Sequence, residues 1–224
     1  MGTQIALTIL FLLAFLLLLA FIELVYKRLN LQGEYTRKLA HFSATLSTIT
    51  FPYLFTDHWY VLALAVIFFV LLLGSRNTSR LRSIHDITRI SSGSFLLPAA
   101  IYFAFLISHL MEDRFLFILP MLILAISDPI AGLLGMNITR YNHEIILFKH
   151  RMGKTWLGSM AFFTSAFIIC LIAFYFNKGG FELQTVGLSV IIAIVTATAE
   201  LLSPKGTDNL VIPMSIILVL ILFA

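Results

Sequence analysis

The sequence predicts an all-α integral membrane protein, a polytopic bundle of about eight transmembrane helices in one domain. Two observations carry this prediction. Of the 224 residues, 60% are hydrophobic and 12% are charged, whereas soluble globular domains average about 45–50% apolar and about 25% charged residues. The apolar residues also gather in runs close to the roughly 20 residues that a helix needs to cross a bilayer. The single cysteine, Cys170, excludes a disulfide framework and a metal–thiolate cluster.

Eight apolar stretches follow one another with no linker or internal repeat between them. The third and the last are short, so seven full spans are an alternative. No charged side chain precedes the first stretch, which is longer than the apolar core of a signal peptide. We therefore expect a retained helix, peripheral to a core formed by residues 27–224. The predicted spans cover residues 4–26, 38–56, 59–74, 93–110, 115–135, 156–176, 185–203 and 209–224.

The basic residues predict the orientation of the bundle. All of the 15 Lys and Arg except Arg114 and Lys178 lie in the connections after the first, third, fifth and seventh spans. The positive-inside rule places these connections in the cytoplasm and both termini outside. The opposite connections are short, so an active site is expected on the cytoplasmic side. The net charge of +4 is explained by this topology, and we expect membrane lipids and no nucleic acid as partners.

Arg37, Lys38 and His41 open the second predicted span. Arg37 and His41 are four residues apart and Lys38 and His41 are three apart, so all three share one helical face. Such a basic face near the membrane surface can contact phosphate groups. In the alternative interpretation, Arg37 and Lys38 only anchor the helix at the membrane surface, and His41 is an interfacial histidine with satisfied hydrogen bonds.

Asp128 lies inside the fifth predicted span. An ionisable group in hydrocarbon costs at least about 2.5–3.5 kcal/mol, which makes it a candidate functional residue. Pro129 cannot donate to the carbonyl of Ala125, so we expect a kinked or broken helix beside this carboxylate. Carboxylate and freed carbonyl oxygens suit Mg²⁺. The alternative is a buried aspartate that is paired with an arginine for packing alone.

Gly153, Lys154 and Thr155 precede the sixth predicted span. They resemble the end of a P-loop, but Phe148 stands where that motif needs a glycine. A helix start with small residues still offers backbone N–H groups to an anion, and Arg151 and Lys154 add two cations. The alternative is an interfacial anchor. The candidate phosphate-binding residues of this segment are Gly153, Thr155, Gly158 and Ser159.

Two more acids lie where the last two predicted spans meet. Glu200 is near the end of the seventh span, and Asp208 and Asn209 begin the eighth. Asp208 or Asn209 could simply cap that helix, but Pro213 leaves the Asn209 carbonyl without its helical donor. We therefore expect Asp128, Glu200 and Asp208 to converge on the cytoplasmic side. The loop before the fourth span adds basic and small polar residues suited to phosphate oxygens, namely Arg89, Ser92 and Gly93.

These clusters form five short motifs in a fixed order. The motifs are Arg37-Lys38-x-x-His41, Arg89 followed by Ser92-Gly93, Asp128-Pro129-x-Ala131-x-x-x-Gly135, Gly153-Lys154-Thr155-x-x-Gly158-Ser159, and Glu200 with Asp208-Asn209-Leu210-x-x-Pro213. Together they resemble the dolichol kinase and phytol kinase branch of the CTP-transferase membrane proteins, over nearly the whole chain after the first span. The chain departs from the family at Leu157, where an acid is usual before Gly-Ser, and at Ser127, where some relatives have glycine.

The resemblance implies a multi-helix membrane enzyme that transfers the terminal phosphate of CTP, or another nucleoside triphosphate, to a lipid alcohol with the help of Mg²⁺. The acceptor could be a polyprenol, a phytol-like alcohol or a diacylglycerol. One alternative is a cytidylyltransferase that forms a CDP-lipid from a phospholipid acid, although its longer acidic signature is missing. Another is a small-solute transporter, which would need polar groups leading to both faces of the membrane.

In this interpretation the lipid alcohol enters from the bilayer and presents its hydroxyl at the cytoplasmic interface. We expect Asp128 and Lys154 to be catalytic, and His41 or one of the acids to take the hydroxyl proton. The short chain favours a bacterial plasma membrane. The expected metal ligands are Asp128, Glu200, Asp208 and Asn209, and the expected cations around the transferred phosphate are Arg37, Lys38, Arg89 and Lys154.

Overall fold

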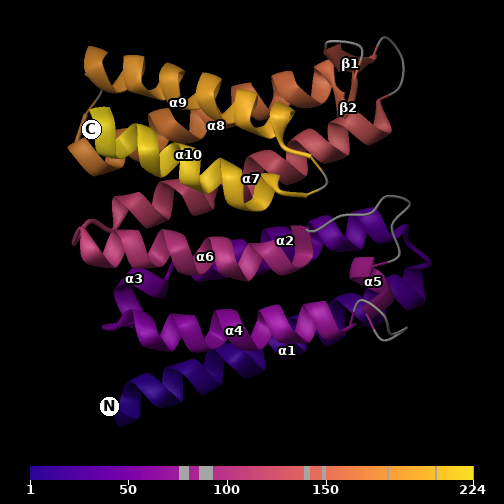
Figure 1. Cartoon of the computed structure of the whole chain (residues 1–224), viewed down its shortest axis with the longest axis vertical. Helices are drawn as coiled ribbons and strands as arrows, with labels where there is room; N and C mark the ends of the chain where they lie inside the picture. Colours follow the sequence, from indigo (N-terminus) through magenta and orange to yellow (C-terminus); the bar gives the residue numbers. More distant parts are fainter. Residues whose placement is uncertain are drawn as a thin grey trace.

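The structure is a computed structural model of the chain, and it describes residues 1–75, 81–85, 93–138, 142–147, 150–180, 182–204 and 206–223. These residues form a helical bundle with one small hairpin (Figure 1). The elements, in order, are α1 (Gly2–Leu29), α2 (Gly33–Thr48), α3 (Phe51–Leu54), α4 (His58–Ser75), α5 (Arg82–His85), α6 (Gly93–Leu110), α7 (Phe115–Asn137), β1 (Glu144–Leu147), β2 (His150–Thr155), α8 (Trp156–Lys178), α9 (Leu183–Leu202) and α10 (Asp208–Phe223).

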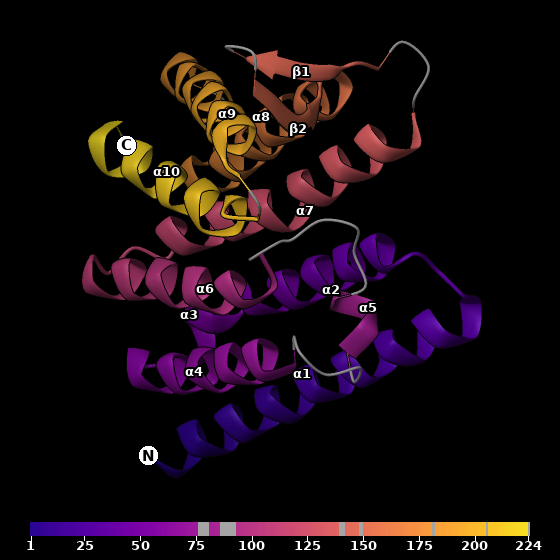
Figure 2. The ribbon, with the colours of Figure 1, turned by 45° about the vertical axis from the view of Figure 1, so that its right-hand side comes forward.

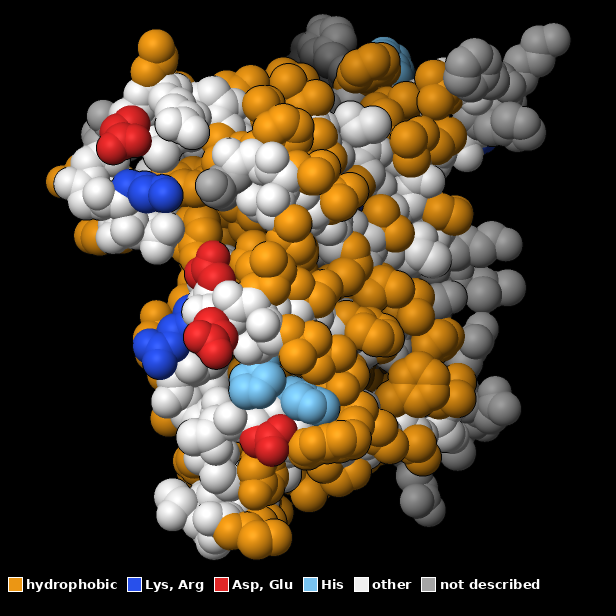
Figure 3. Space-filling view, turned by 60° about the vertical axis from the view of Figure 1, so that its left-hand side comes forward, with side chains coloured by type: hydrophobic (Ala, Val, Ile, Leu, Met, Phe, Trp, Pro, Cys, Tyr) orange, Lys and Arg blue, Asp and Glu red, His pale blue; other side chains and the backbone are white. Residues whose placement is uncertain are grey.

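Six helices of the described residues are long and apolar enough to cross a membrane, which confirms the predicted polytopic helix bundle. A seventh helix, α10, is also apolar but has 16 residues, or about 24 Å. Hydrophobic side chains cover much of the molecular face in Figure 3, as a lipid-facing surface requires. The six long helices are α1, α4, α6, α7, α8 and α9.

The second predicted span differs most from the structure. Helix α2 begins at Gly33 rather than at residue 38 and ends at Thr48, and the short helix α3 follows. Pro52 lies in the first turn of α3, where its ring prevents α2 from continuing through this point. Helix α2 is amphipathic and is not among the six candidate spans. Its polar face therefore turns toward the protein and not toward lipid.

Helix α7 lies at the centre of the bundle, where α2, α6, α8 and α10 contact it. Figure 2 shows α1, α2, α4 and α6 on one side of α7, and α8, α9, α10 and the hairpin on the other. Helix α1 lies at the edge and buries only Ile22 and Glu23. Both termini lie at the end of the bundle opposite the hairpin (Figure 1). A central helix in contact with both halves can hold polar groups away from lipid.

Of the kink or break expected at Pro129, the break is wrong, because α7 is one helix from Phe115 to Asn137. Two side chains of α2 support its backbone around the proline. His41 donates from Nε2 to the Leu124 carbonyl (3.1 Å), and Lys38 donates from Nζ to the Asp128 carbonyl (3.2 Å). A neighbouring helix that supplies donors in this way allows proline inside a membrane helix. The proline therefore coincides with the place where α2 and α7 exchange polar contacts.

The antiparallel hairpin β1–β2 was not predicted from the sequence. It joins α7 to α8 and pairs Glu144 with Thr155 at its base. Lys154 consequently lies on the last part of a strand, and Thr155 is the N-cap residue of α8. The segment expected to begin a helix thus holds Lys154 in extended backbone, where side chains alternate between two faces.

Candidate active site

A polar cavity of about 710 Å³ opens at the hairpin end of the bundle. It lies where α2, α7, β2, α8 and the start of α10 meet. Every acid singled out in the sequence lines it, together with the lysines of the first and fourth motifs. The structure therefore brings together residues that are far apart in the chain. These residues are Lys38, Asp128, Lys154, Glu200 and Asp208.

Asp128 is paired with a lysine and not with an arginine. Lys38 Nζ lies 2.6 Å from Asp128 Oδ2, and the two side chains are only 8% and 7% exposed. Gly132 leaves the space for this contact, because a Cβ atom there would lie 2.7 Å from Lys38 Cε. Because either charge would be costly to bury without its partner, the two side chains are constrained to stay in contact.

His41 lies beside the same pair. Its Nε2 atom is 3.8 Å from Asp128 Oδ2, and it donates to the Leu124 carbonyl. A carbonyl only accepts, so Nε2 carries the hydrogen in this arrangement and Nδ1 is the nitrogen left to accept a proton. The nearby carboxylate would stabilise the imidazolium form. His41 can therefore serve as a proton acceptor through Nδ1.

Lys154 joins the other two acids. Its ammonium donates to the Glu200 carboxylate and lies 3.1 Å from Asp208 Oδ2. Burial by itself would lower the pKa of Lys154, but the carboxylates of Asp208 and Glu200 outweigh it and hold this pKa above its usual value. Lys154 is therefore positively charged at neutral pH and is held in place at the cavity wall.

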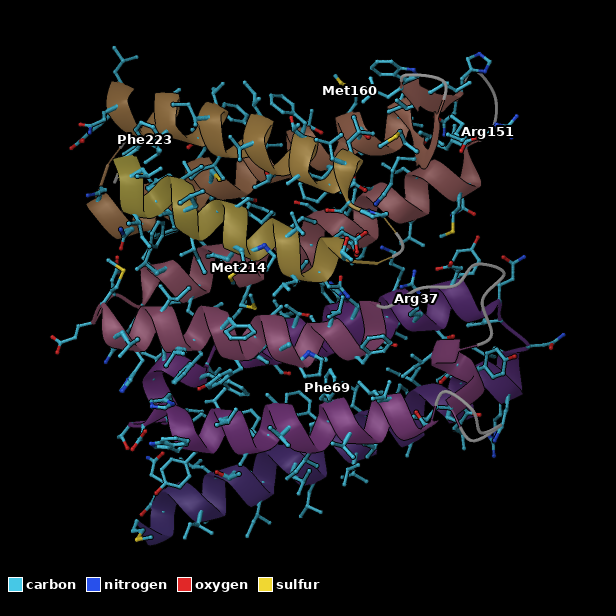
Figure 4. The ribbon with its side chains drawn as sticks, viewed as in Figure 1. Arg37, Phe69, Arg151, Met160, Met214 and Phe223 are labelled. Atoms are coloured by element: carbon cyan, nitrogen blue, oxygen red, sulfur yellow. The ribbon has the colours of Figure 1, made fainter. Side chains whose placement is uncertain are left out.

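Arg151 does not join Lys154 in the cavity, contrary to expectation. The two residues are three apart on β2, so their side chains point to opposite faces of the strand. The Arg151 side chain is 79% exposed and lies 3.8 Å from Glu144. Figure 4 shows Arg151 on the outer end of the hairpin, far from Arg37 on α2. Only one of the two expected cations of this segment reaches the site.

The expected row of free backbone donors at the start of α8 is also wrong. The first three N–H groups of this helix already have acceptors within the protein, because the hairpin folds back over the helix start and Thr155 caps it. Such caps are the usual partners of helix-terminal N–H groups. Trp156 donates to the His143 carbonyl (3.2 Å), Leu157 to Asn142 Oδ1 (3.2 Å) and Gly158 to Thr155 Oγ1 (3.2 Å).

Gly158 and Gly153 therefore have structural functions. A Cβ atom at Gly158 would lie 3.0 Å from the Ala131 carbonyl oxygen and 3.7 Å from Gly135 Cα, so glycine allows α7 and α8 to pack closely. Gly153 has a φ of +67°, which favours glycine, and its N–H donates to Glu144 Oε1 (3.1 Å). Both line the cavity, but neither offers a free N–H to an anion.

The remaining phosphate-binding candidates are placed as follows. Arg37 lines the cavity and is held by Glu34, with Nη2 2.7 Å from Oε2. The Ser159 hydroxyl is buried without a hydrogen-bond partner in the described part of the chain and belongs to a residue that lines the cavity. Arg37 and Ser159 thus keep groups that a bound phosphate could use.

Asn209 and Gly93 connect the start of α10 to the start of α6. Asn209 Nδ2 donates to the Gly93 carbonyl at 2.6 Å, and both residues are buried. This bond uses only the Nδ2 donor and leaves Oδ1, the amide atom that could bind a metal, uninvolved. Arg89 and Ser92, the other candidates of this loop, lie outside the described residues.

The donor set fits Mg²⁺ by its chemistry, although the acids are not gathered into a ready-made cage. In the described part of the chain, no group of three or more His, Cys, Asp or Glu could hold a metal ion. The reason is that lysines separate the acids. Glu200 Oε2, however, is buried with no hydrogen-bond partner among the described residues. Magnesium needs only one or two carboxylates when substrate phosphates complete its shell, so these oxygens fit a metal that arrives with a nucleotide.

Three residues of the site were missed in the sequence. Glu34 positions Arg37, and its signal was the spacing of three residues on one helix. Gly132 makes room for Lys38, and Asn142 caps α8 and also donates to the Ile138 carbonyl at 2.7 Å. The functions of Gly132 and Asn142 could not be recognised in the sequence, because both contact residues that only the tertiary fold brings close to them.

Comparison with known proteins gives a distant similarity. The chain is 27% identical over 195 residues to the phytol kinase of Synechocystis sp., and the match covers 84% of this chain and 78% of that protein. No protein-family model and no solved structure matches the chain. The match supports a distant relationship to phytol kinase and dolichol kinase-like proteins.

Proposed function

We propose that this chain is a membrane-embedded lipid kinase that transfers the terminal phosphate of CTP to the hydroxyl of a lipid alcohol. The observation that carries the proposal is the polar cavity of about 710 Å³, whose wall holds two lysines and three acids in one buried and one partly buried ion-pair group. The similarity to a phytol kinase agrees with this chemistry. We place the enzyme in a bacterial plasma membrane.

Phosphoryl transfer requires positive charge around the transferred group and an aligned acceptor. In this proposal Lys154 supplies that charge from β2, and Arg37 supplies it from α2. Lys154 is well suited, because Glu200 and Asp208 fix its ammonium and keep it charged. Fixed charges aimed at the developing negative charge are the strongest contribution that a protein makes to such a reaction.

The acceptor oxygen forms a bond to the terminal phosphorus while the bond from that phosphorus to the bridging oxygen breaks, and CDP leaves. The hydroxyl proton goes to a base on the enzyme. We assign this role to His41 through Nδ1, since Nε2 donates to the Leu124 carbonyl. The carboxylate of Asp128, 3.8 Å from Nε2, then stabilises the imidazolium. Lys38 in turn holds Asp128 in place.

Magnesium, when bound with the nucleotide, would neutralise the phosphate oxygens. One or two of the carboxylates of Asp128, Glu200 and Asp208 would hold it, and the substrate phosphates would complete its shell. The three carboxylates also fix the two lysines of the cavity, so each acid keeps a cation at a defined position whether or not a nucleotide is present.

The test is product analysis with purified protein in detergent or vesicles. CTP labelled on the terminal phosphate, and separately on the first phosphate, is offered with phytol, a polyprenol or diacylglycerol, with Mg²⁺ or with a chelator. The proposal expects the terminal label in a lipid monophosphate, release of CDP, and no transfer with the chelator. Release of pyrophosphate with the first label in the lipid would instead indicate a cytidylyltransferase. ATP, tested in the same way, checks the choice of donor.

A further inference from the structure

The ammonium of Lys154 lies between two carboxylates that come from different helices. It donates to Glu200 Oε1 on α9 and lies 3.1 Å from Asp208 Oδ2, on the first residue of α10. The side chains of Glu200, Asp208 and Lys154 are only 4%, 13% and 16% exposed. The two carboxylates are therefore gathered around one cation, and that cation belongs to the protein itself.

The remaining oxygens of these two carboxylates depend little on the rest of the protein. Asp208 Oδ1 accepts from the N–H of Asn209 at 3.0 Å. Glu200 Oε2 is buried and has no hydrogen-bond partner among the described residues. Within the same residues, Lys154 is the only cation paired with either acid. Without its ammonium, two largely buried carboxylates would face each other with no counter-ion, which is costly. They would then be an oxygen site for another cation.

The other lysine of the cavity does not offer a comparable site. Lys38 pairs with one carboxylate, that of Asp128, and its second contact is the Asp128 backbone carbonyl. Gly132 leaves just enough space for its side chain. Hard divalent cations such as Mg²⁺ and Mn²⁺ prefer carboxylate oxygens. Two carboxylates around one position make the Glu200–Asp208 pair the stronger candidate.

The charge of the cavity decides when a divalent cation can bind to this pair. The described residues of its wall carry one net negative charge while Lys154 is present, and two if its charge is removed. A cation placed next to the ammonium would also be repelled by it, because like charges a few ångströms apart interact strongly in a poorly solvated site. These charged residues are Glu34, Asp128, Glu200 and Asp208 against Arg37, Lys38 and Lys154.

We propose that Lys154 keeps divalent cations away from the Glu200–Asp208 pair until a nucleoside triphosphate binds. The triphosphate then provides new acceptors for the ammonium, and the two carboxylates become free for the cation that arrives with the nucleotide. Asp208 Oδ2 lies 3.1 Å from the ammonium, so a magnesium–oxygen bond of about 2.1 Å needs a side-chain shift of only about 1 Å. The inference rests on the proposed function and describes how its site is regulated.

Binding of Mn²⁺ alone, without nucleotide or acceptor, tests this inference. The free ion is counted by its electron paramagnetic resonance signal in detergent-solubilised protein. Lys154→Met should bind Mn²⁺ at least about 10-fold more tightly than the wild type, because a repelling charge beside the site is removed. Lys154→Arg keeps the charge and should bind as weakly as the wild type. The matched control Arg151→Met removes the same charge from the exposed face of the same strand, and it should also bind weakly.

Melting temperatures provide a second readout and show whether each variant is folded. Mn²⁺ should raise the melting temperature of Lys154→Met and leave that of the wild type unchanged, because a ligand stabilises the state that binds it. The double variant Lys154→Met, Glu200→Gln should lose the added Mn²⁺ site. Lys154→Gln is the second neutral variant, since its amide can still donate to one carboxylate and support folding.

Mn²⁺ binding by the wild type as tight as that by Lys154→Met would overturn the inference. So would a folded neutral variant that gains no Mn²⁺ site, or a gained site that persists in the double variant. None of these measurements involves phosphoryl transfer. A gained Mn²⁺ site in a protein whose wild type phosphorylates no lipid alcohol would therefore retain the function of Lys154 at the carboxylates and reject the kinase.

Discussion

The ammonium of Lys38 on α2 lies 2.6 Å from the carboxylate of Asp128 on α7, and both side chains are more than nine-tenths buried. Lys38 also donates to the backbone carbonyl of Asp128 at 3.2 Å. One lysine therefore fixes both the side chain and the backbone at the proline-containing part of α7. The pair joins the amphipathic helix α2 to the central helix of the bundle, so it supports the fold as well as the site.

Removal of one member of this pair should destabilise the protein. Lys38→Met leaves Asp128 buried without its counter-ion, and we expect a loss of about 3–5 kcal/mol. The double variant Lys38→Met, Asp128→Leu removes both charges and should recover most of that stability without any phosphoryl transfer. Thermal unfolding in detergent measures the first effect and the transfer assay the second. Wild-type melting of Lys38→Met would show that the pair contributes nothing to the fold.

Lys154 and Arg151 provide a matched comparison on β2. Lys154→Ala should lower kcat/KM for the transfer by about 10²-fold or more, because a fixed charge is lost from the transition state. Arg151→Ala should change it little, since that side chain is exposed on the outer face of the hairpin. Steady-state kinetics at saturating acceptor measures both. Similar losses in the two variants would mean that the hairpin acts through its fold and not through Lys154.

The raised pKa of Lys154 gives a pH dependence of stability with a defined sign. An ordinary lysine titrates near about 10.4, and Lys154 titrates above its usual value in the folded protein because of Asp208 and Glu200. The ion pairs of Lys154 therefore stabilise the protein fully at any pH below the pKa of this lysine in the unfolded chain. This stabilisation is lost only as the pH rises through the higher pKa of Lys154 in the folded protein. The difference in melting temperature between wild type and Lys154→Ala should be constant from pH 7 to 9 and shrink above about pH 10.4. A difference that already shrinks below pH 9 would contradict this.

We expect Gly158 to be required for the packing of α8 against α7, and therefore for stability, independently of any effect on activity. Gly158→Ala brings a methyl group to 3.0 Å from the Ala131 carbonyl oxygen, and overpacking of this kind costs about 1–3 kcal/mol. Gly187 in α9 has open space around it, so Gly187→Ala should be neutral or stabilise by up to about 1 kcal/mol through helix propensity. Chemical denaturation of the two variants provides the comparison. Equal stabilities would contradict the close α7–α8 contact.

The long helices could be predicted from the sequence because burial in lipid demands continuous apolar runs. The predicted span 93–110 coincides with α6, and the others agree within a few residues. Helix α2 could not be delimited in this way, because it is amphipathic and packs its polar face on α7. The hairpin was missed for a related reason. Its strands are short, and β2 is mostly polar, so no run of alternating apolar and polar residues marks them in the sequence.

The sequence predicted which residues belong to the site better than it predicted which of them form ion pairs with one another. Asp128, Glu200 and Asp208 were expected to converge, because acids in membrane helices face polar partners or a water-filled cavity. All three line the polar cavity. That Asp128 contacts Lys38, 90 residues away, could not be derived, since several cations were available. The packing function of Gly158 could not be derived from the sequence either, because it depends on the distance between α7 and α8.

The central claim is that the polar cavity holds the nucleoside triphosphate, and protection of an engineered cysteine tests it most directly. The chain has one cysteine, Cys170, which is buried in the core, so a water-soluble thiol reagent should report on an added cysteine. Met136 lines the cavity and is 40% exposed, whereas Ile146 on β1 is 62% exposed and does not line it. We predict that CTP with Mg²⁺ slows labelling of Met136→Cys and leaves that of Ile146→Cys unchanged. Unchanged labelling of Met136→Cys at a CTP concentration that supports transfer would contradict the account.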